Sequence, residues 1–403
     1  MTAAAAVTGL GVIAPNGEGT EAYWKSTLAG VSGIGELTRF DAADYPAKLA
    51  GEVRFDAAAH LSSRLIPQTD HMTRLSLAAA DWALADAGIA PSELPDFSTG
   101  VITAATAGGF EFGQRELENL WSKGPKYVSA YQSYAWFYAV NTGQISIQHG
   151  MRGPSGVVVS DQAGGLDALA QSRRQIRKGT RLIISGGVDG SLCPWGWVAQ
   201  MAGDRMSTSR DPEDAYLPFD ARAAGHVPGE GGALLVLEDA ESARRRGADV
   251  YGEIAGYGAT MDPRPGSGRE PGLRRALASA LEDAGITPAE VDVVFADAAA
   301  VPELDRIEAD ALSALFGAGG VAVTAPKTMT GRLAAGAAPL DVAAALLSIR
   351  DGVIPPTVNV SRADGYDLDL VTEARRTPVR TAVVLARGHG GFNSAVVVRG
   401  EAK

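Results

Sequence analysis

The sequence predicts an α/β protein built from two duplicated βαβ halves. The clearest observation is an internal repeat, in which "ALADAGIAPSE" at 83–93 returns as "ALEDAGITPAE" at 280–290. A weaker repeat relates residues 161–179 to residues 330–352. Two matches in the same order indicate a duplication rather than chance. Short apolar strands alternate with amphipathic helices in both halves, which favours parallel sheets stacked into an α-β-α-β-α body.

In the first half, each expected element carries its own local signal. Residues 83–93 contain the end of a helix, a glycine cap and a turn with proline. The apolar run at 99–106 predicts the next strand. The β-branched run at 157–160 predicts another strand, which a tight turn joins to the helix within 161–179, and "RLIISGG" at 181–187 predicts a third strand.

The second half repeats this series. Residues 280–290 again end a helix, and "VDVVFADAAA" at 291–300 predicts the strand that follows. A helix within 330–352 precedes the strand "TAVVLARG" at 381–388. We therefore divide the chain into an N-terminal half, residues 1–245, and a C-terminal half, residues 246–403.

Composition excludes several classes of function. The chain has 403 residues and a net charge of −11, which argues against nucleic acid or an anionic membrane as its partner. Its one cysteine, Cys193, allows no intrachain disulfide, and no basic leader or membrane-length apolar run is present. We expect a cytoplasmic protein without a metal site.

The first half contains a long insertion at about residues 107–155. It is dense in aromatic residues, including "SAYQSYAWFYAVNTGQ". These residues could be ordinary core. An aromatic segment that also bears Asn and Gln in an insertion is better explained as an oligomer interface.

The stretch "VVVSDQAGGLDAL", residues 157–169, has the pattern of a nucleophile elbow. Enzymes often place a nucleophile at such a strand-to-helix turn, where the helix N-terminus favours developing negative charge. The residue at this turn is Gln162, and an amide is not a nucleophile. The elbow is therefore present without its usual chemistry.

Six ordered motifs connect the whole chain to a known family. They are "TGLGVIAPNG" (8–17), "NTGQISIQHGMRGPS" (141–155), "LPFDARAAGHVPGEGGALLVLED" (217–239), "VPELDRIEADAL" (301–312), "PKTMTGRLAAGAA" (326–338) and "ARGHGGFNSAVVV" (386–398). Together with the duplicated halves and the elbow, they resemble the β-ketoacyl synthases, which have the thiolase fold. A resemblance in this many ordered motifs is specific.

The resemblance implies three catalytic positions, and all three are changed here. The family's cysteine falls on Gln162, and its two histidines fall on Asp297 and Arg332. A glutamine cannot form the thioester, and charged side chains cannot act as neutral imidazole donors to a thioester oxygen. We expect no condensing activity. Because the family's histidines converge on its cysteine, we also expect Asp297 and Arg332 to form an ion pair.

Outside the three catalytic positions, some of the family's residues are retained in this chain and others are replaced. Asp305, Glu308 and Lys327 match residues that surround the histidines of an active synthase, and we expect them to form a buried ionic network here. The family's gating phenylalanine falls on His389. The family's Arg-Asp pair before Gly-Phe falls on Ala223 and Ala224.

An intact fold with glutamine at the elbow and no catalytic triad resembles the chain-length factor, or ketosynthase β subunit, of type II aromatic polyketide synthases. The resemblance implies a heterodimer with a catalytic ketosynthase α subunit, in an antibiotic or pigment pathway. It also implies that an acyl carrier protein delivers substrates on its phosphopantetheine arm and that the chain needs no cofactor of its own. The chemistry then belongs to the partner subunit.

The segment that the resemblance ties to chain length is "GGFEFGQRELENLW", residues 108–121. Phe110, Gly113 and Leu117 stand at i, i+3 and i+7, on one face of a helix. In chain-length factors the matching face closes the tunnel of the growing chain, and bulkier residues there go with shorter products. Small to medium residues predict a deep tunnel and a product longer than an octaketide, with a decaketide as the specific expectation. An ordinary buried helix stripe is the alternative.

Two other functions remain open. The chain could be a malonyl-acyl-carrier-protein decarboxylase, in which the Gln162 amide donates to the thioester carbonyl while the acetyl primer forms; related priming domains keep both histidines, however, and this chain has neither. It could also be an inactive scaffold with no role in the tunnel.

Overall fold

The computed structural model describes residues 4–361 and 365–401, and its main feature is a 12-stranded mixed sheet. Each half of the chain contributes five strands in the same spatial order. The N-terminal path is β6-β5-β7-β8-β1, and the C-terminal path is β11-β10-β15-β16-β9, with β13 beyond β11. The first two neighbour pairs of each path are parallel and the last two are antiparallel. The duplication predicted from the sequence repeats is therefore confirmed.

The bounds of these strands follow the apolar runs of the sequence. They are β1 (Ala5–Ala14), β5 (Thr99–Ala104), β6 (Ser155–Val158), β7 (Leu182–Asp189), β8 (Gly231–Asp239), β9 (Gly252–Met261), β10 (Val293–Phe295), β11 (Ala322–Thr324), β13 (Asp369–Leu370), β15 (Thr381–Gly388) and β16 (Phe392–Arg399). The strand expected at 291–300 is shorter than predicted. It ends at Phe295, because Ala298 and Ala300 adopt positive φ angles of 50° and 54° that no strand allows.

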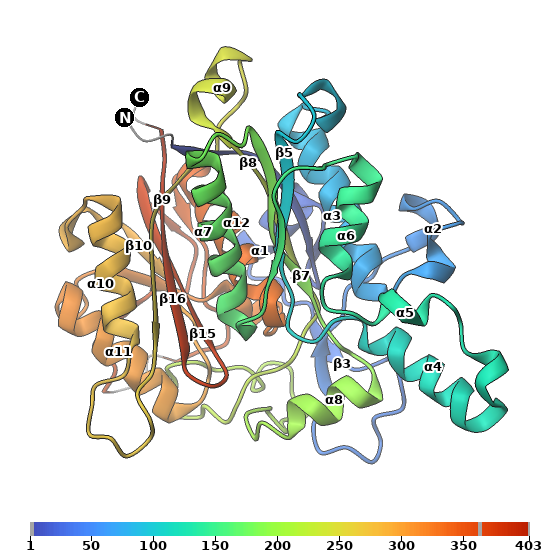
Figure 1. The fold of residues 1–403 in the computed structure, drawn as a ribbon. Coiled ribbons are helices and arrows are strands. Elements are labelled where there is room, and N and C mark those ends of the chain that lie inside the picture. Colours follow the sequence, from blue (N-terminus) through green and yellow to red (C-terminus); the bar gives the residue numbers. More distant parts are fainter. Residues whose placement is uncertain (1–3, 362–364, 402–403) are drawn as a thin grey trace.

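Helices form the other layers of the body. Figure 1 shows α7 (Gly164–Arg177) and α12 (Ala337–Asp351) between the two parts of the sheet. The outer helices are α3 (His71–Ala87) and α6 (Val140–His149) on one side, and α10 (Leu273–Ala284) and α11 (Pro302–Phe316) on the other. The α-β-α-β-α order predicted from the sequence is confirmed, but the expectation of parallel sheets is wrong for half of the pairs, since β7/β8, β8/β1, β15/β16 and β16/β9 are antiparallel.

The repeat extends to single atomic contacts between a strand and its outer helix. A Cβ atom added to Gly9 would lie 2.2 Å from the carbonyl oxygen of Ala83, and one added to Gly256 would lie 2.2 Å from that of Ala280. Glycine is needed at both sites because the helix backbone touches the strand. The backbone N–H of Leu10 donates to Asp86 at 2.8 Å, and that of Tyr257 donates to Asp283 at 3.0 Å. The motif "DAG" thus caps and docks the helix in each half.

Smaller elements surround this body. The insertion forms α4 (Phe110–Lys123) and α5 (Gln132–Ala135), and α4 projects from one side of the molecule in Figure 1. The remaining helices are α1 (Thr20–Leu28), α2 (Ala57–His60), α8 (Pro194–Met201) and α9 (Ala240–Arg245). None of the helices in the described ranges has both the length and the apolar character needed to cross a membrane.

Candidate functional site

The three residues that the resemblance aligns with the catalytic triad, Gln162, Asp297 and Arg332, lie in loops between strands and helices. Gln162 lies in the 3₁₀ turn η4 (Asp161–Ala163) between β6 and α7. Asp297 follows β10, and Arg332 lies between two 3₁₀ turns, η6 (Pro326–Met329) and η7 (Ala334–Gly336). The carboxyl ends of parallel strands meet at one edge of a sheet, where open α/β sheets place their sites.

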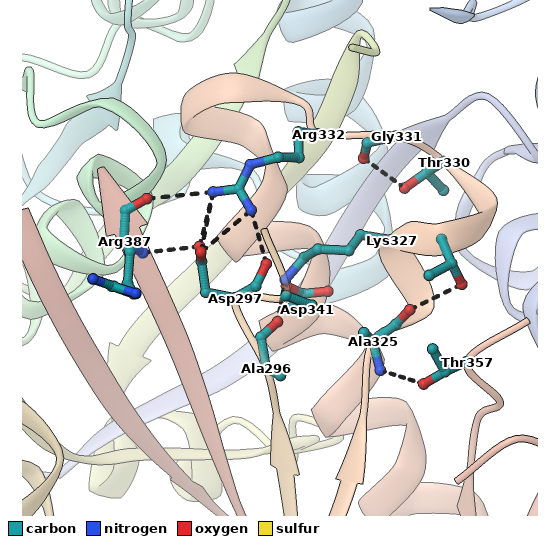
Figure 2. A network of polar contacts seen from close by, with 12 residues as sticks. Ala296, Asp297, Ala325, Lys327, Thr330, Gly331, Arg332, Asp341, Thr357 and Arg387 are labelled. Carbon is teal, nitrogen blue, oxygen red and sulfur yellow. Dashed lines mark hydrogen bonds and ion pairs between the residues drawn. The ribbon is translucent and has the colours of Figure 1, made fainter. Parts of the chain in front are cut away.

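Asp297 and Arg332 form the predicted ion pair. Nη2 of Arg332 lies 3.0 Å from Oδ1 of Asp297 and 3.2 Å from Oδ2, and Nη1 lies 3.3 Å from Oδ2. Arg332 also donates to the carbonyl oxygens of Asp297 at 2.9 Å and Arg387 at 3.3 Å, as Figure 2 shows. Both side chains are buried, with 4% and 6% of the side-chain surface exposed. The prediction from the two family histidines is confirmed.

The pair is ionised and closed. Burial alone would raise the pKa of Asp297, but the charges of Arg332 and Lys327 outweigh it and hold the pKa below its usual value. Burial opposes the charge of Arg332, and the Asp297 carboxylate more than offsets this and raises the pKa of the guanidinium. The backbone N–H of Arg387 also donates to Oδ1 of Asp297 at 2.9 Å. Neither side chain offers the neutral donor that a ketosynthase histidine supplies.

Lys327, Glu308 and Asp305 are all buried beside this pair, but they do not form one continuous ion network. Lys327 pairs with Asp341 of α12 at 2.6 Å and donates to the carbonyl oxygen of Ala296. Glu308 accepts the backbone N–H groups of Asp297 at 2.7 Å and Ala298 at 2.8 Å. The three residues are buried, as expected, but the expected ionic network among them is wrong, because Lys327 pairs with Asp341, a residue that the sequence analysis did not name.

The two acids of this group act mainly on the backbone. Oδ2 of Asp305 accepts the N–H of Phe219 at 2.9 Å. Burial raises the pKa of Asp305 to about 7, and burial together with the charge of Asp297 raises the pKa of Glu308. Glu308 holds the loop of Asp297 and Ala298 in its positive-φ conformation, so these acids fix the geometry of the altered site.

The elbow is tied to the C-terminal glycine turn. Asp161 has a φ of 53°, and its Oδ2 accepts the backbone N–H of His389 at 2.7 Å. Ser160 donates to Asp167 of α7 at 2.5 Å. Gln162 is half-buried, and no side chain or backbone group in the described residues hydrogen-bonds to its amide. His389, at the gate position, has an exposed side chain.

Two aromatic residues near Arg332 were missed by sequence reasoning. Tyr216 donates its hydroxyl to the carbonyl oxygen of Ala298 at 2.9 Å. Burial and the positive charge of Arg332 lower the pKa of His226 to about 3, so this imidazole is neutral. His226 follows Gly225 in the segment where the family has Gly-Phe, and that departure is the only signal that could have pointed to it.

The proposed chain-length face lies on α4, as predicted, and in this chain alone Phe110 and Gly113 are packed while Leu117 is exposed. The Phe110 ring stacks on Trp195 of α8, with centroids 4.4 Å apart. A Cβ atom added to Gly113 would lie 3.3 Å from the Trp195 ring and 3.5 Å from Cβ of Trp136. Leu117 is 40% exposed. The spacing of residues in the sequence does not predict that Trp195 contacts this face, because the two segments come together only in the folded chain.

The aromatic residues of the insertion are largely exposed, so the core alternative is wrong for them. Of the fourteen large apolar side chains exposed in the described residues, eight lie within residues 107–155: Leu117, Trp121, Tyr127, Tyr131, Trp136, Phe137, Tyr138 and Ile147. A monomeric protein rarely exposes so concentrated a group. The exposure of these side chains is consistent with the prediction that the insertion forms an oligomer interface, which stays a prediction.

The polar side of α4 borders a cavity of about 280 Å³. Its lining includes Arg39, Glu111, Arg115 and Cys193. Burial raises the pKa of the Cys193 thiol to about 11, so this thiol is not a replacement nucleophile. Within residues 4–361 and 365–401, no cluster of three His, Cys, Asp or Glu side chains could hold a metal ion.

Comparison with known proteins identifies the family. The description "Beta-ketoacyl synthase, N-terminal domain" matches residues 3–243, and "Beta-ketoacyl synthase, C-terminal domain" matches residues 251–361. The chain belongs to the β-ketoacyl synthase family. It is 63% identical to the tetracenomycin polyketide synthase ketoacyl synthase beta subunit of Streptomyces glaucescens over 398 residues, which cover 98% of this chain and 97% of that protein. It is 60% identical to the actinorhodin polyketide putative beta-ketoacyl synthase 2 of Streptomyces coelicolor over 397 residues, covering 98% of each.

Solved structures of β-ketoacyl synthases agree with this assignment. The ishigamide ketosynthase/chain length factor superposes with a TM-score of 0.89 at 27% identity, and the match covers 100% of both chains. A type II PKS acyl-carrier protein in complex with its ketosynthase gives a TM-score of 0.88 at 26% identity, again over 100% of both chains. The thiolase fold and the resemblance to ketosynthase β subunits of polyketide synthases are confirmed.

Proposed function

We propose that this chain is the non-condensing subunit of a heterodimeric polyketide ketosynthase and that it sets the length of the polyketide chain. The observation that carries the proposal is the closed ion pair of Asp297 and Arg332, the two residues that the sequence resemblance aligns with the catalytic histidines. With Gln162 at the elbow, that position has no nucleophile to form a thioester, and neither Asp297 nor Arg332 can act as a neutral imidazole donor to one. The condensing chemistry then belongs to a paired ketosynthase α subunit.

The length-setting part of the proposal rests on α4. Its face of Phe110, Gly113 and Leu117 ends at the surface, and Leu117 is exposed in the isolated chain. When a partner subunit covers this face, the same residues can close a tunnel that runs between the two chains. Because Gly113 has no side chain and Leu117 is of medium size, we propose a product longer than an octaketide, and specifically a decaketide.

The partners follow from the same assignment. The group of exposed aromatic side chains in residues 107–155 is suited to bind the α subunit. Among the described residues, strand β6 is an edge of the sheet and pairs only with β5, so its other side is suited to pairing with a second chain. An acyl carrier protein would deliver the substrates on its phosphopantetheine arm, with no cofactor held by this chain, in the biosynthesis of an aromatic antibiotic or pigment.

The test changes the volume of the length-setting face. In Gly113→Thr combined with Leu117→Phe, the added atoms at 113 meet the exposed ring of Trp195, which must shift. A closed core would lose about 1–3 kcal/mol from such overpacking, whereas a tunnel end can absorb the volume by becoming shorter. The heterodimer should form normally, and mass analysis of the released chain should show one or more two-carbon units fewer.

A matched control places the same kind of bulk on the other side of the helix. Ser122→Phe lies on the exposed opposite side of α4 and should leave the product unchanged. A stable complex with an unchanged product in the Gly113/Leu117 variant would remove residues 110–117 from the length-setting role. Loss of the complex would mean that this face is ordinary packing.

The second candidate is a malonyl-acyl-carrier-protein decarboxylase. The half-buried amide of Gln162, with no hydrogen-bond partner in the described residues, favours it, since that amide is free to donate to a thioester carbonyl. The terminal nitrogens of Arg332 are already engaged by Asp297 and Arg387, so they are not available as a second donor. Acetyl-carrier formation by the isolated subunit, lost in Gln162→Ala, would favour this function over the first.

A further inference from the structure

Helix α4, which carries the proposed length-setting face, has no capping side chain of its own. Its N-cap residue is Gly109, and the first N–H groups of a helix need acceptors from elsewhere. The N–H of Gly109 donates to the carbonyl oxygen of Trp136 at 3.0 Å. The N–H of Phe112 donates to Oδ2 of Asp70 at 2.7 Å. Asp70 lies forty-two residues earlier in the chain, so a distant carboxylate holds the start of α4.

The same carboxylate caps a second helix. Asp70 is the N-cap of α3, and its Oδ1 accepts the N–H of Met72 at 2.9 Å. One side chain therefore joins the N-termini of α3 and α4. Both termini present positive partial charge to it, which suits a carboxylate. Helix α3 packs on the sheet of the N-terminal half, so this carboxylate links α4 to the rigid body.

The joint is buried and tightly packed. Asp70 is 4% exposed, and a Cβ atom added to Gly109 would lie 3.0 Å from Cβ of Asp70 and 2.1 Å from the carbonyl oxygen of Ala135. Glu116 provides a second anchor on the same helix, since its Oε2 accepts the N–H of Ser129 at 2.7 Å and its side chain is buried. The remaining length of α4 projects from the body in Figure 1.

These anchors are next to the length-setting residues along the helix. Phe112 precedes Gly113, and Glu116 precedes Leu117. We propose that Asp70 is a positioning residue for chain length, which holds the Phe110/Gly113/Leu117 face at a fixed depth through the N–H of Phe112. The inference rests on the proposed function and adds a residue that itself lines no tunnel. A helix start that is free to shift would blur the end of the tunnel and mix product lengths.

The substitution Asp70→Asn isolates the contact with α4. Asparagine caps helices about as well as aspartate, so α3 keeps its cap. Met72 and Phe112 donate to different oxygens of Asp70, so when the amide oxygen of asparagine accepts from Met72, its NH2 group, a donor, faces the N–H of Phe112. In the heterodimer, hydrogen exchange at the Phe112 amide should become about tenfold faster or more, because a bond to a charged acceptor is lost. The ratio of off-length to main product should rise several-fold, while the amount of heterodimer stays constant.

The control is Asp56→Asn. Asp56 caps α2 through the N–H of Ala58 at 3.0 Å in the same way, and within the described residues it makes no hydrogen bond to α4. It should change neither the exchange at Phe112 nor the product ratio. If Asp70→Asn does not fold, Asp70→Ser serves instead, since serine also caps α3 and is too short to reach Phe112.

The outcomes separate this inference from the proposed function. Faster exchange at Phe112 with a broadened product range supports it. Faster exchange with an unchanged product ratio overturns it, because Asp70 would then be structural only. If Gly113→Thr with Leu117→Phe shortens the product while both Asp70 variants keep one product length, the positioning role alone is wrong. If none of these variants alters the product, the proposed function is wrong as well.

Discussion

At the scale of residues, the altered site has a carboxylate and a guanidinium that neutralise each other, at the positions that the resemblance aligns with two histidines. The sequence resemblance aligns Asp297 and Arg332 with the family's histidines, and the two side chains bind each other through three N···O contacts of 3.0–3.3 Å. Burying one charge alone would be costly, so each substitution is tolerable only with the other. The pair is thus a structural replacement for a catalytic one.

Breaking this pair should be strongly destabilising. In Asp297→Asn the amide oxygen can still accept from the N–H of Arg387, but Arg332 becomes a buried charge without a counter-ion. We expect the free energy of unfolding in urea to fall by about 3–5 kcal/mol. Asp297→Asn combined with Arg332→Met should recover most of this loss, because no unpaired charge is left.

An exposed ion pair provides the comparison for this prediction. Arg245 and Glu241 lie 3.4 Å apart on α9, and both are about 70% exposed. Arg245→Gln should cost about 1 kcal/mol or less. Equal effects of Asp297→Asn and Arg245→Gln would contradict the view that the buried pair stabilises the altered site.

Asp305 should make stability depend on pH. Burial raises its pKa to about 7 from 3.8, so between these values the folded chain holds a proton that the unfolded chain has lost. The contribution of this group to the free energy of unfolding then falls by about 1.4 kcal/mol per pH unit from about pH 4 to about pH 7, and levels off above. Asp305→Asn removes this slope. Relative to the unaltered chain, the variant should gain stability as pH rises through that window, as measured by urea midpoints; a constant difference would contradict the assignment.

Some contacts between residues could be predicted from the sequence and others could not. The pairing of Asp297 with Arg332 was predictable, because a family motif fixed both positions and their charges are opposite. The Lys327–Asp341 pair and the stacking of Trp195 on Phe110 were not, since they join segments that no motif spacing relates. Contacts across the core depend on the packed fold rather than on local pattern.

At the scale of elements, the elbow keeps its form through contacts that do not involve the nucleophile position. Asp161 accepts the N–H of His389, and Ser160 donates to Asp167, so both sides of Gln162 are held. Helix α7 begins directly after this turn, as the sequence predicted. The strand at 291–300 is the element that was predicted too long, because an apolar composition does not reveal the positive φ angles of Ala298 and Ala300.

Restoring the nucleophile should therefore not restore the reaction. In Gln162→Cys the thiol would be placed at the start of α7, where the helix dipole favours a thiolate. Decarboxylation of the malonyl extender still lacks both histidines, and the Asp297–Arg332 pair stays in their place. We expect no condensation by the purified single variant in a malonyl-carrier assay. Robust condensation without any partner subunit would show that the altered triad is not what prevents the reaction.

At the scale of the whole molecule, the duplicated architecture was predictable because the two halves still share sequence at their outer helices. The motif at 83–93 and its copy at 280–290 dock on glycines of β1 and β9 through the same contacts. The predicted insertion at 107–155 is too long, because α6 at its end is an outer helix like α11 of the second half; α4 and α5 have no such counterpart, so duplication says nothing about their conformation. The aromatic content of the insertion predicted an oligomer interface. In the structure of the single chain these aromatic side chains are exposed, as expected for an interface whose partner is absent.

A substitution of Phe137 tests whether the α subunit covers the exposed aromatic side chains of the insertion. Trp136, Phe137 and Tyr138 are consecutive exposed aromatic residues, and Trp136 also contacts the length-setting face at Gly113. Aromatic residues buried in an interface carry much of its binding energy, so Phe137→Ser should weaken the heterodimer about tenfold or more, as measured by the dissociation constant. The thermal stability of the isolated subunit should change little, because the side chain is 39% exposed before binding.

Met261→Ser is the control, since Met261 is 52% exposed on β9, and Figure 1 shows β9 and α4 on opposite sides of the molecule. Equal dissociation constants for the two variants and the unaltered chain would place the partner on another surface, and would separate the aromatic insertion from the tunnel that α4 is proposed to close.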